Sequence, residues 1–379
     1  GVVMMSKQRK SKSSFLTTKL IPFLIAFLVI MVVYNAVSLM DIGKALGPAI
    51  YHVNEVKAPA KISIAVISDA SCNLCSDIAP DVNKIKAKNI EIENEAFFDV
   101  SSPESQVLVA KYAIEKIPAI LVIGEIDKVK LPGFKQVKDV LLFDNVKPPF
   151  VLVKNGEQRG AVQITHLKNS DCEDCVSWDG VIANLAKDQL TVAGVEVVEY
   201  DSAEGKELIQ KYDINKLPTL LFSNDLAEYP DIAGTWAERG SVEPDGMYVL
   251  REVGAPYYDF DSGNIKGLVE VTYLVDESCE ECYDVAVHKS ILGKYGVKIN
   301  SEKTVDIASS EGKEILEKYE ITQVPTIVLS EGVSVYSQLA QIWASVGSVE
   351  EDDSYVFRNV ANMGGIVFKD LETGELVGQ

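Results

Sequence analysis

The chain has 379 residues, enough for two to four domains of about 100–200 residues each. It is 47% hydrophobic and 24% charged, which is the composition of a globular protein and excludes a disordered or fibrous one. Its 36 Lys and Arg against 56 Asp and Glu give a net charge of -20. This acidity argues against a nucleic-acid-binding protein, because phosphate contacts need clustered cations.

The first segment of the chain is typical of a membrane anchor. Residues 1–19 are a basic tail with five cations and no acid, and residues 20–40 carry no charge. At about 1.5 Å per residue, a helix of this length spans a hydrocarbon core of about 30 Å. The cation bias predicts a single-pass protein with a cytoplasmic N-terminus and extracytoplasmic domains. The alternative is a cleaved signal peptide, because Ala36-Val37-Ser38 is an acceptable cleavage site.

The segment after the anchor, residues 41–60, contains two prolines and is predicted to be a short stalk. Without the five cations of the tail, the remaining chain has 31 Lys and Arg and 56 Asp and Glu, a net charge of -25. A domain array this acidic repels anionic lipid headgroups, so we expect it to stand away from the membrane surface.

All six cysteines fall into three C-x-x-C pairs, and each pair begins a repeat. A proline follows the first cysteine of each pair at a distance of 46 residues, within the related segments KYAIEKIPAILV, KYDINKLPTLLF and KYEITQVPTIVL. The cysteines are Cys72 and Cys75, Cys172 and Cys175, and Cys279 and Cys282, and the prolines are Pro118, Pro218 and Pro325. This periodicity predicts three tandem domains, at residues 61–158, 159–264 and 265–379.

Each repeat is predicted to run strand, helix, strand, helix, strand. In the first, residues 61–68, 90–98 and 119–124 have the β-rich pattern of strands. Residues 73–88 are predicted to be a helix with the cysteines at its N-terminus. Residues 101–112 are predicted to be a second helix, opened by a Ser cap and a Pro. An acid precedes that second helix in each repeat, namely Asp99, Asp201 and Asp306, and Trp236 and Trp343 are predicted to pack in the core.

A C-x-x-C where a strand meets a helix, with a proline before the next core strand, resembles the thioredoxin-like superfamily. In the first repeat Cys75-Ser-Asp-Ile-Ala-Pro80 is similar to the helix after the thioredoxin cysteines, including its kinking proline. The resemblance covers nearly all of residues 61–379. It implies three tandem thioredoxin-like three-layer α/β/α domains behind one N-terminal transmembrane helix. It also implies that Pro118, Pro218 and Pro325 have cis peptide bonds beside the cysteines and bind substrate.

The sequence departs from the family six residues before each first cysteine. Thioredoxins carry a buried acid there that handles protons, whereas this chain has Val66, His166 and Tyr273. His166 is therefore a candidate proton shuttle, or else a core or interface histidine. His52 and His288 are predicted to be ordinary surface or stalk residues.

Two cysteines three residues apart can close a small disulfide ring. At a helix N-terminus, unpaired N–H groups favour the thiolate of the first cysteine. We therefore predict that Cys72, Cys172 and Cys279 attack substrate disulfides and that Cys75, Cys175 and Cys282 resolve the mixed disulfides. A cis proline opposite the pair would leave an open backbone edge for an extended substrate strand.

The residues inside the rings predict a ranking of the three pairs. Asn73-Leu74 is neutral, whereas Glu173-Asp174 and Glu280-Glu281 are anionic. A neighbouring carboxylate disfavours a thiolate, so the first pair should be the most easily reduced. The other two pairs would donate electrons to it or serve as structural disulfides.

Together these patterns predict a membrane-anchored, extracytoplasmic thiol–disulfide oxidoreductase. Its partners would be thiols or disulfides of exported proteins, and a membrane redox partner is a further candidate. We predict no cofactor, nucleic acid or metal, because a C-x-x-C is half of a tetrahedral metal site and the three pairs lie on separate domains. The alternative is a redox-inert acidic scaffold or binding module with three structural disulfides.

Overall fold

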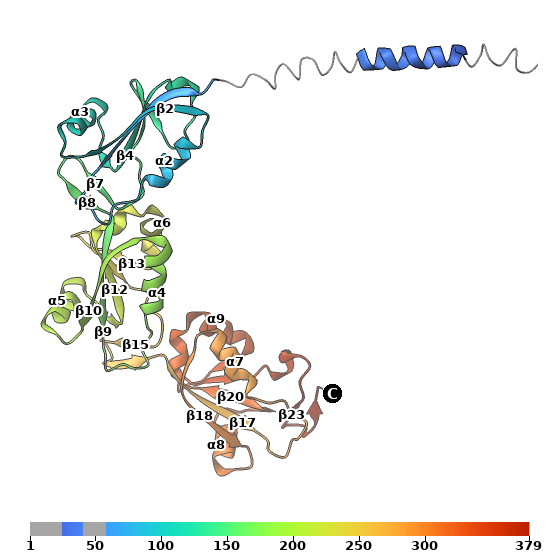
Figure 1. Ribbon diagram of the computed structural model, residues 1–379. Helices are drawn as coiled ribbons and strands as arrows, with labels where there is room; N and C mark the ends of the chain where they lie inside the picture. Colours follow the sequence, from blue (N-terminus) through green and yellow to red (C-terminus); the bar gives the residue numbers. More distant parts are fainter. Residues whose placement is uncertain (1–24, 41–57, 379) are drawn as a thin grey trace, which may run out of the picture.

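The computed structural model describes residues 25–40 and 58–378. From residue 58 onward the chain is a mixed α/β protein of three repeated sheet units that follow one another, consistent with thioredoxin-like domains (Figure 1). We call residues 60–159 the first unit, 161–266 the second and 268–377 the third. Each unit contains a five-stranded central sheet and a separate three-stranded sheet.

The elements of the three units recur in the same order. The first unit comprises β1 (Ala60–Ser68), α2 (Ala79–Lys86), β2 (Ile90–Asp99), α3 (Pro103–Tyr112), β3 (Lys116–Ile117), β4 (Ala119–Gly124), η1 (Ile126–Lys128), β5 (Lys135–Val137), β6 (Val140–Phe143), β7 (Phe150–Leu152) and β8 (Glu157–Arg159). The second comprises β9 (Ala161–Lys168), α4 (Asp179–Asn184), η2 (Leu185–Gln189), β10 (Thr191–Glu199), α5 (Ala203–Tyr212), β11 (Lys216–Leu217), β12 (Thr219–Phe222), η3 (Asn224–Glu228), α6 (Pro230–Ala233), η4 (Trp236–Glu238), β13 (Gly240–Val242), β14 (Tyr248–Leu250), β15 (Tyr257–Asp259) and β16 (Asn264–Lys266). The third comprises β17 (Leu268–Val275), α7 (Val287–Lys294), β18 (Lys298–Asp306), α8 (Ser310–Lys318), β19 (Gln323–Val324), β20 (Thr326–Leu329), η5 (Glu331–Val335), α9 (Ser337–Val346), β21 (Gly347–Val349), β22 (Tyr355–Phe357), η6 (Val360–Met363), β23 (Phe368–Asp370) and β24 (Leu376–Val377).

The central sheet has the same topology in every unit. In the first unit the strand order is β2-β1-β4-β6-β5, with β1 parallel to β2 and antiparallel to β4. The corresponding orders are β10-β9-β12-β14-β13 and β18-β17-β20-β22-β21. The strand that leads to the cysteines is therefore flanked on both sides in each sheet. In β1 the four successive residues 64–67 are all buried, as expected where both faces of a sheet are covered.

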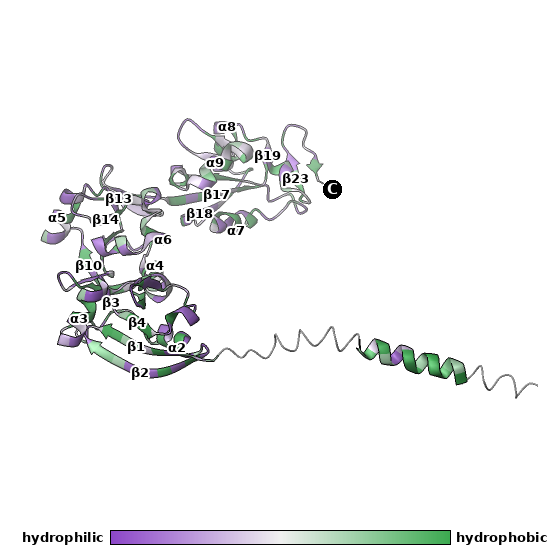
Figure 2. Ribbon diagram, turned by 90° about the horizontal axis from the view of Figure 1, so that it is seen from above, coloured by the Kyte–Doolittle hydropathy of each residue, from purple (hydrophilic) through white to green (hydrophobic). Residues whose placement is uncertain are grey.

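Helices cover both faces of the first sheet. Val82 and Ile85 of α2 pack with Ile62 and Ile64 of β1 in one apolar cluster. Tyr112 of α3 packs with a second cluster on the opposite face, which includes Ile67 and Leu121. In Figure 2 the strands β1 and β4 are mostly apolar, as expected for the middle layer.

A second, three-stranded sheet follows the central sheet of each unit. Its strand orders are β3-β7-β8, β11-β15-β16 and β19-β23-β24. The last two strands form a hairpin, whose turn contains Gly156, Gly263 or Gly374, each with a positive φ. The first strand of this sheet ends at the residue before the repeated proline. The small sheet therefore begins at the candidate site.

The hairpin of one unit also forms the connection to the next. Strand β8 ends at Arg159 and β9 begins at Ala161, with only Gly160 between them, and Gly267 alone separates β16 from β17. Both glycines have a positive φ, +85° and +92°. A Cβ on Gly160 would lie 2.3 Å from the Cβ of Pro148, so a side chain is excluded here by both backbone conformation and space.

Most of the predicted elements of the first unit are confirmed. The strands predicted at 61–68, 90–98 and 119–124 agree with β1, β2 and β4 to within one residue. The second helix begins at Pro103, and its N-cap Ser102 accepts a hydrogen bond from the amide of Ser105. The prediction of a helix over residues 73–88 is wrong at its start, because α2 begins only at Ala79. Pro80 lies in the first turn of α2 and does not kink a helix interior.

The predicted membrane anchor lies at the edge of what the structure describes. Residues 25–40 are helical and largely exposed. Across the described ranges, no helix combines the length and the apolar character needed to cross a bilayer. Residues 20–24 of the predicted anchor and residues 41–57 of the predicted stalk are outside the described residues, as is His52. The transmembrane helix therefore stays a prediction.

Candidate active site

Each C-x-x-C pair is closed as a disulfide at the end of a central strand. The S–S distances are 2.08, 2.01 and 2.01 Å, and the Cα atoms are 5.4–5.5 Å apart. Cys72 and Cys279 are half-buried, whereas Cys172 is only 7% exposed. The disulfide of the second unit is therefore the least accessible at its first sulfur.

The cysteines lie in a turn and not at a helix N-terminus, which corrects the sequence-based expectation. The helix that follows begins four residues after Cys75, four after Cys175 and five after Cys282. The turn is closed by backbone bonds, with the amide of the first cysteine donating to the carbonyl of Asp69, Asn169 or Asp276 at 3.0–3.1 Å. The N–H groups of a helix end therefore do not stabilise these thiolates as predicted.

In each unit, a carboxylate at the end of the neighbouring strand holds the cysteine turn in place through a hydrogen bond. Asp99, Glu199 and Asp306 end the edge strands β2, β10 and β18. Each accepts a hydrogen bond, at 2.7–3.0 Å, from the amide two residues before the first cysteine. Hydrogen bonds from Ser101 and from the Ala70 amide lower the pKa of Asp99, so it is ionised at neutral pH.

This recurring contact also corrects one assignment within the repeats. The acid that corresponds to Asp99 in the second unit is Glu199 and not Asp201. Both Asp99 and Glu199 lie 27 residues after the first cysteine of their unit, and Asp306 has the same spacing. The fixed spacing was a signal available in the sequence, but the change from Asp to Glu concealed it.

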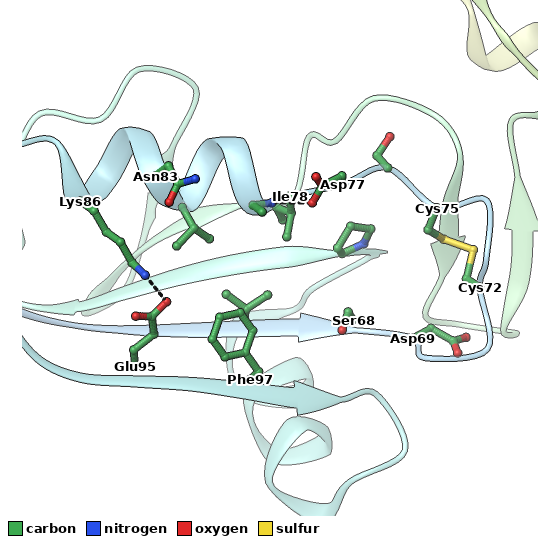
Figure 3. Close-up of a pocket in the computed structure, with 15 residues that line it drawn as sticks. Ser68, Asp69, Cys72, Cys75, Asp77, Ile78, Asn83, Lys86, Glu95 and Phe97 are labelled. Atoms are coloured by element: carbon green, nitrogen blue, oxygen red, sulfur yellow. Dashed lines mark hydrogen bonds and ion pairs between the residues drawn. A yellow bond between two sulfur atoms is a disulfide. The ribbon is translucent and has the colours of Figure 1, made fainter. Parts of the chain in front are cut away.

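The repeated prolines have cis peptide bonds in all three units. In the first unit, Pro118 lines a cavity of about 360 Å³ together with Cys72 and Cys75 (Figure 3). In the third unit, Pro325 lines a cavity of about 500 Å³ together with Cys279 and Cys282. In these two units a small molecule or side chain entering the cavity would meet the disulfide and the proline together.

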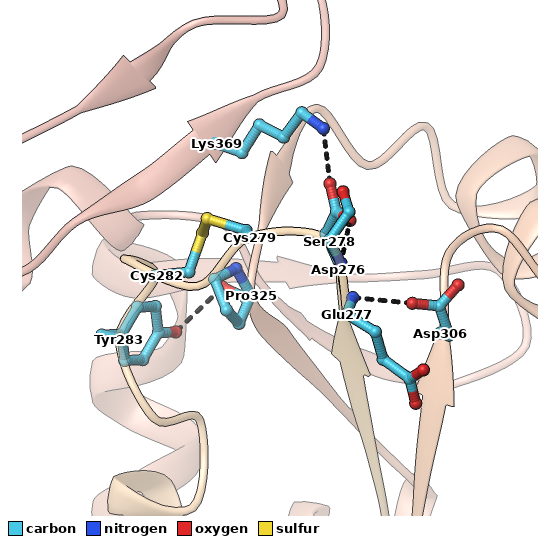
Figure 4. The surroundings of a disulfide bond; sticks show 9 residues. All are labelled: Asp276, Glu277, Ser278, Cys279, Cys282, Tyr283, Asp306, Pro325 and Lys369. Carbon is cyan, nitrogen blue, oxygen red and sulfur yellow. Dashed lines mark hydrogen bonds and ion pairs between the residues drawn. A yellow bond between two sulfur atoms is a disulfide. The ribbon is translucent and has the colours of Figure 1, made fainter.

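Two aromatic side chains tie the cis-proline loops to the segment after the cysteines. Trp178 Nε1 donates to the carbonyl oxygen of Pro218 at 2.9 Å, and Tyr283 donates its hydroxyl to that of Pro325 at 2.9 Å. Figure 4 shows Tyr283 beside Pro325 and the Cys279–Cys282 disulfide. Sequence analysis missed this pair because the aromatic residue comes three positions after Cys175 but one position after Cys282.

The residues six positions before the first cysteine are buried in all three units: Val66, His166 and Tyr273. His166 is 6% exposed, and its Nε2 has no hydrogen-bond partner among the described residues. Burial lowers the pKa of His166, so its imidazole is neutral at pH 7. Tyr273 donates to Glu302 at 3.2 Å, and burial raises the pKa of Tyr273 to about 12.

An ion pair closes the far end of the cavity in the first and third units. Lys86 and Glu95 are 2.7 Å apart, at the end away from the disulfide (Figure 3). Lys289 and Glu302 are 2.6 Å apart in the third unit. Sequence analysis did not single out these acids, although each lies four residues before the turn-holding carboxylate. The second unit has Val195 at that position, 45% exposed.

His288 corrects the prediction of a surface residue. It is 4% exposed, packs against Phe357, and its Nε2 lies 3.0 Å from the hydroxyl of Tyr283. Burial lowers the pKa of His288 to about 4. Trp236 and Trp343 are buried in the core as predicted, at 4% and 3% exposure.

One backbone edge of the segment before each cis proline is already occupied by the middle strand of the three-stranded sheet, whereas sequence analysis predicted an open edge. Ile117 pairs with Val151 of β7, Leu217 with Tyr258 of β15, and Val324 with Lys369 of β23. The same segment contacts the disulfide turn, because the amide after the second cysteine donates to the carbonyl of Pro149, Pro256 or Val367 at 2.8–2.9 Å. An incoming strand would have to displace this pairing to use the same edge.

In the third unit an ion pair adds to this cover. Lys369 Nζ lies 2.5 Å from the carboxylate of Asp276, whose side chain is nearly buried (Figure 4). Asp276 also closes the turn that carries Cys279. Val151 and Tyr258 occupy the place of Lys369 in the other units, so this charged contact is specific to the third.

Comparison with known proteins identifies no family for this chain. No family model matches the sequence, and no curated protein matches it. A crystal structure of ERdj5 form II is similar at 12% identity and a TM-score of 0.15, over 77% of this chain and 42% of that one. The crystal structure of human ERp44 is similar at 11% identity and a TM-score of 0.15, over 83% of this chain and 95% of that one. Superpositions this poor carry no weight, and the fold assignment rests on the sheet topology.

Proposed function

We propose that this protein is a thiol–disulfide oxidoreductase whose reactive groups are the C-x-x-C disulfides. The observation that carries the proposal is the shared cavity of the first unit, where a half-buried disulfide and a cis proline line the same opening. A purely structural disulfide does not need to be accessible from such a cavity. The same arrangement in the third unit, around Pro325, supports the proposal independently.

The reaction is an exchange of sulfur partners. A substrate thiolate attacks Cys72 Sγ, the Cys72–Cys75 bond breaks, and Cys75 leaves as a thiolate while a mixed disulfide forms. A second substrate thiolate then attacks the substrate sulfur of that mixed disulfide and releases Cys72. The substrate is oxidised by two electrons and the cysteine pair is reduced by two. In the reverse direction the Cys72 thiolate attacks a substrate disulfide and Cys75 resolves the intermediate.

In the second unit we propose His166 as the group that accepts a proton from the resolving cysteine. Its imidazole is neutral and its Nε2 has no hydrogen-bond partner among the described residues, as a group that takes part in proton transfer requires. Val66 cannot serve in this way, and Tyr273 has its hydroxyl bonded to Glu302. Exchange at Cys172–Cys175 should then depend on the imidazole of His166. In the first unit the resolving cysteine should lose its proton to solvent.

We further propose that residues 20–40 anchor the protein in a membrane, with the three units outside the cytoplasm. The support is the uncharged run and the cations before it. Thiols and disulfides of exported proteins are then the proposed substrates, and a membrane redox partner is the proposed source or acceptor of electrons. The units themselves would stay off the lipid because of their acidity.

The second candidate is a redox-inert scaffold, and the covered edge favours it. The three-stranded sheet occupies the backbone edge beside each cis proline, as described above. A redox titration distinguishes the two functions. The protein is equilibrated in glutathione buffers, free thiols are alkylated, and each pair is quantified by mass spectrometry. The oxidoreductase predicts at least one pair that titrates between glutathione and dithiothreitol potentials, whereas the scaffold predicts none.

A further inference from the structure

The hairpin that pairs with β3 beside the first disulfide is held by the second unit. This hairpin consists of β7 and β8, and we call it the first cover. Residues 147–149, just before it, are bonded to the disulfide turn, because Ser76 donates its amide to Pro149 and its hydroxyl to Lys147, at 2.9 and 2.6 Å. The two cysteines also pack against the apolar cluster that contains Val151 of β7. The first cover thus lies between solvent and the edge that a substrate strand needs.

The contacts from the second unit come from the short helix η3. Asp225 Oδ1 accepts hydrogen bonds from Arg159 Nε at 3.0 Å and from the amide of Gly160 at 2.8 Å. Glu228 lies 3.5 Å from the guanidinium of Arg159 and 3.9 Å from Lys116 Nζ. Arg159 ends β8 and Lys116 begins β3, so η3 reaches both outer strands of the sheet whose middle strand is β7.

This network is better shielded than an ordinary surface ion pair. The side chains of Arg159 and Asp225 are each 20% exposed, and that of Glu228 is 25% exposed. Tyr229, next to η3, also donates its hydroxyl to the carbonyl of Gly160 at 2.6 Å. Partial burial and several hydrogen bonds on one carboxylate strengthen such a contact.

The second junction lacks the carboxylate, which makes it an internal comparison. The tyrosine contact is kept there, because Tyr336 donates its hydroxyl to the carbonyl of Gly267 at 2.6 Å. The position that corresponds to Asp225 is Gly332, because Asp225 lies four residues before Tyr229 and Gly332 lies four residues before Tyr336. Among the described residues, the third unit therefore holds the connecting glycine through Tyr336 and has no carboxylate at the position of Asp225.

We propose that η3 of the second unit is a latch that controls access of peptide-sized thiols to Cys72–Cys75. Because β8 passes through Gly160 into β9, the first cover cannot swing away from β3 without breaking the bonds of Asp225. Loss of the latch would let β7 leave β3 and free the backbone of Ile117 for a substrate strand. The inference rests on the proposed exchange function for its purpose, but the latch can be measured without it.

The experiment compares Asp225→Asn with Asp231→Asn in the full chain. Asp231 is an exposed acid of the adjacent helix α6, so the control removes the same charge without touching the latch. Each oxidised protein is mixed with dithiothreitol or with a reduced peptide containing two cysteines. Reactions are quenched by alkylation at intervals, and mass spectrometry gives the reduction rate of each pair.

We expect Asp225→Asn to speed reduction of Cys72–Cys75 by the peptide about tenfold, because asparagine keeps an acceptor oxygen but loses the charge that strengthens both hydrogen bonds. The other two pairs should keep their rates, and Asp231→Asn should behave like the wild type. An unchanged rate at Cys72–Cys75, or equal acceleration of all three pairs, would overturn the proposal. Arg159→Gln serves as a second variant and should give the same selective increase.

Amide hydrogen exchange separates failure of the latch from failure of the proposed function. If the peptide reduces no pair in any variant, the oxidoreductase proposal fails. The latch is then judged by the exchange of Val151 and its neighbours in β7, which should be faster in Asp225→Asn than in Asp231→Asn. Equal protection of β7 in both variants would refute the latch whatever the peptide does.

Discussion

Lys298 of the third unit forms an ion pair with Asp174, which lies inside the second C-x-x-C, at 2.9 Å. A carboxylate that was expected to repel the neighbouring thiolate is thus paired with a cation from another unit. The charge argument that ranked the three disulfides is therefore weakened for the second unit. For the second unit, the reduction potential of Cys172–Cys175 therefore depends on the position of the third unit, which supplies Lys298.

We predict that Lys298→Gln makes Cys172–Cys175 harder to reduce. Without the ammonium group, the thiolates of the reduced pair lose a favourable charge, so the reduction potential falls. Both partners are about half exposed, so the shift should be small, on the order of 10 mV, where a tenfold change in equilibrium constant is about 30 mV. The measurement is a redox titration, with Lys294→Gln as the matched control on α7. A rise in potential would contradict the interpretation.

The first pair should still be the main site of exchange. Asn73-Leu74 puts no carboxylate in its ring, and a cavity opens onto both of its sulfurs. We expect a Cys72→Ser/Cys75→Ser variant to lose most of the disulfide-exchange activity measured with a reduced, unfolded substrate. The same double change at Cys172 and Cys175, or at Cys279 and Cys282, should leave most of it. The opposite pattern would reverse the ranking.

The buried His288 should make the third unit sensitive to acid. Its pKa is about 4 in the folded state against an ordinary value of 6.5, so the unfolded chain binds the extra proton first. The contribution of neutral His288 to the free energy of unfolding is therefore complete above pH 6.5. It is lost as the pH falls towards 4, by up to about 3 kcal/mol. Urea unfolding in a Trp178→Phe/Trp236→Phe background, where Trp343 reports on the third unit, should show this loss.

The His288→Gln variant is the control for that prediction. Glutamine keeps an N–H donor for the Tyr283 hydroxyl, which itself donates to Pro325, but cannot be protonated in this range. We therefore expect a lower stability at pH 7 but a flatter dependence on pH between 6.5 and 4. An equally steep dependence in the variant would assign the acid sensitivity to other groups.

Gly160 and Gly156 offer a matched test of the connection between units. Both have a positive φ, but a Cβ on Gly156 meets nothing within 4 Å, whereas one on Gly160 meets the Pro148 ring. Gly156→Ala should cost about 1 kcal/mol of stability from backbone conformation alone. Gly160→Ala should cost roughly 2 kcal/mol or more, because overpacking adds to it. Hydrogen exchange in β7 should rise in the second variant only.

Topology is tested by labelling. A membrane-impermeant alkylating reagent added to intact, mildly reduced cells should label the cysteines of the three units. The basis is the cation bias before residue 20. Labelling that appears only after lysis would reject the extracytoplasmic location and leave the disulfide chemistry unaffected.

The sequence by itself determined the repeat, the sheet units and the positions of the disulfides. Three properties made this possible: apolar runs long enough for central strands, C-x-x-C pairs whose two cysteines are close enough to bond to each other, and a proline at a fixed distance of 46 residues. Each is a local or periodic property of the chain, so it can be read without knowing which distant segments meet.

The tertiary structure alone decided how open the sites are. The pairing of Ile117 with Val151, the latch of Asp225 on Arg159 and the pair of Asp174 with Lys298 each join residues 34 or more positions apart. The type of a residue does not indicate which distant residue it will contact in the folded chain. The start of the helix after the cysteines was missed for a related reason: Ser76 is bound through its amide and its hydroxyl to residues 147–149, and these contacts override local helix propensity.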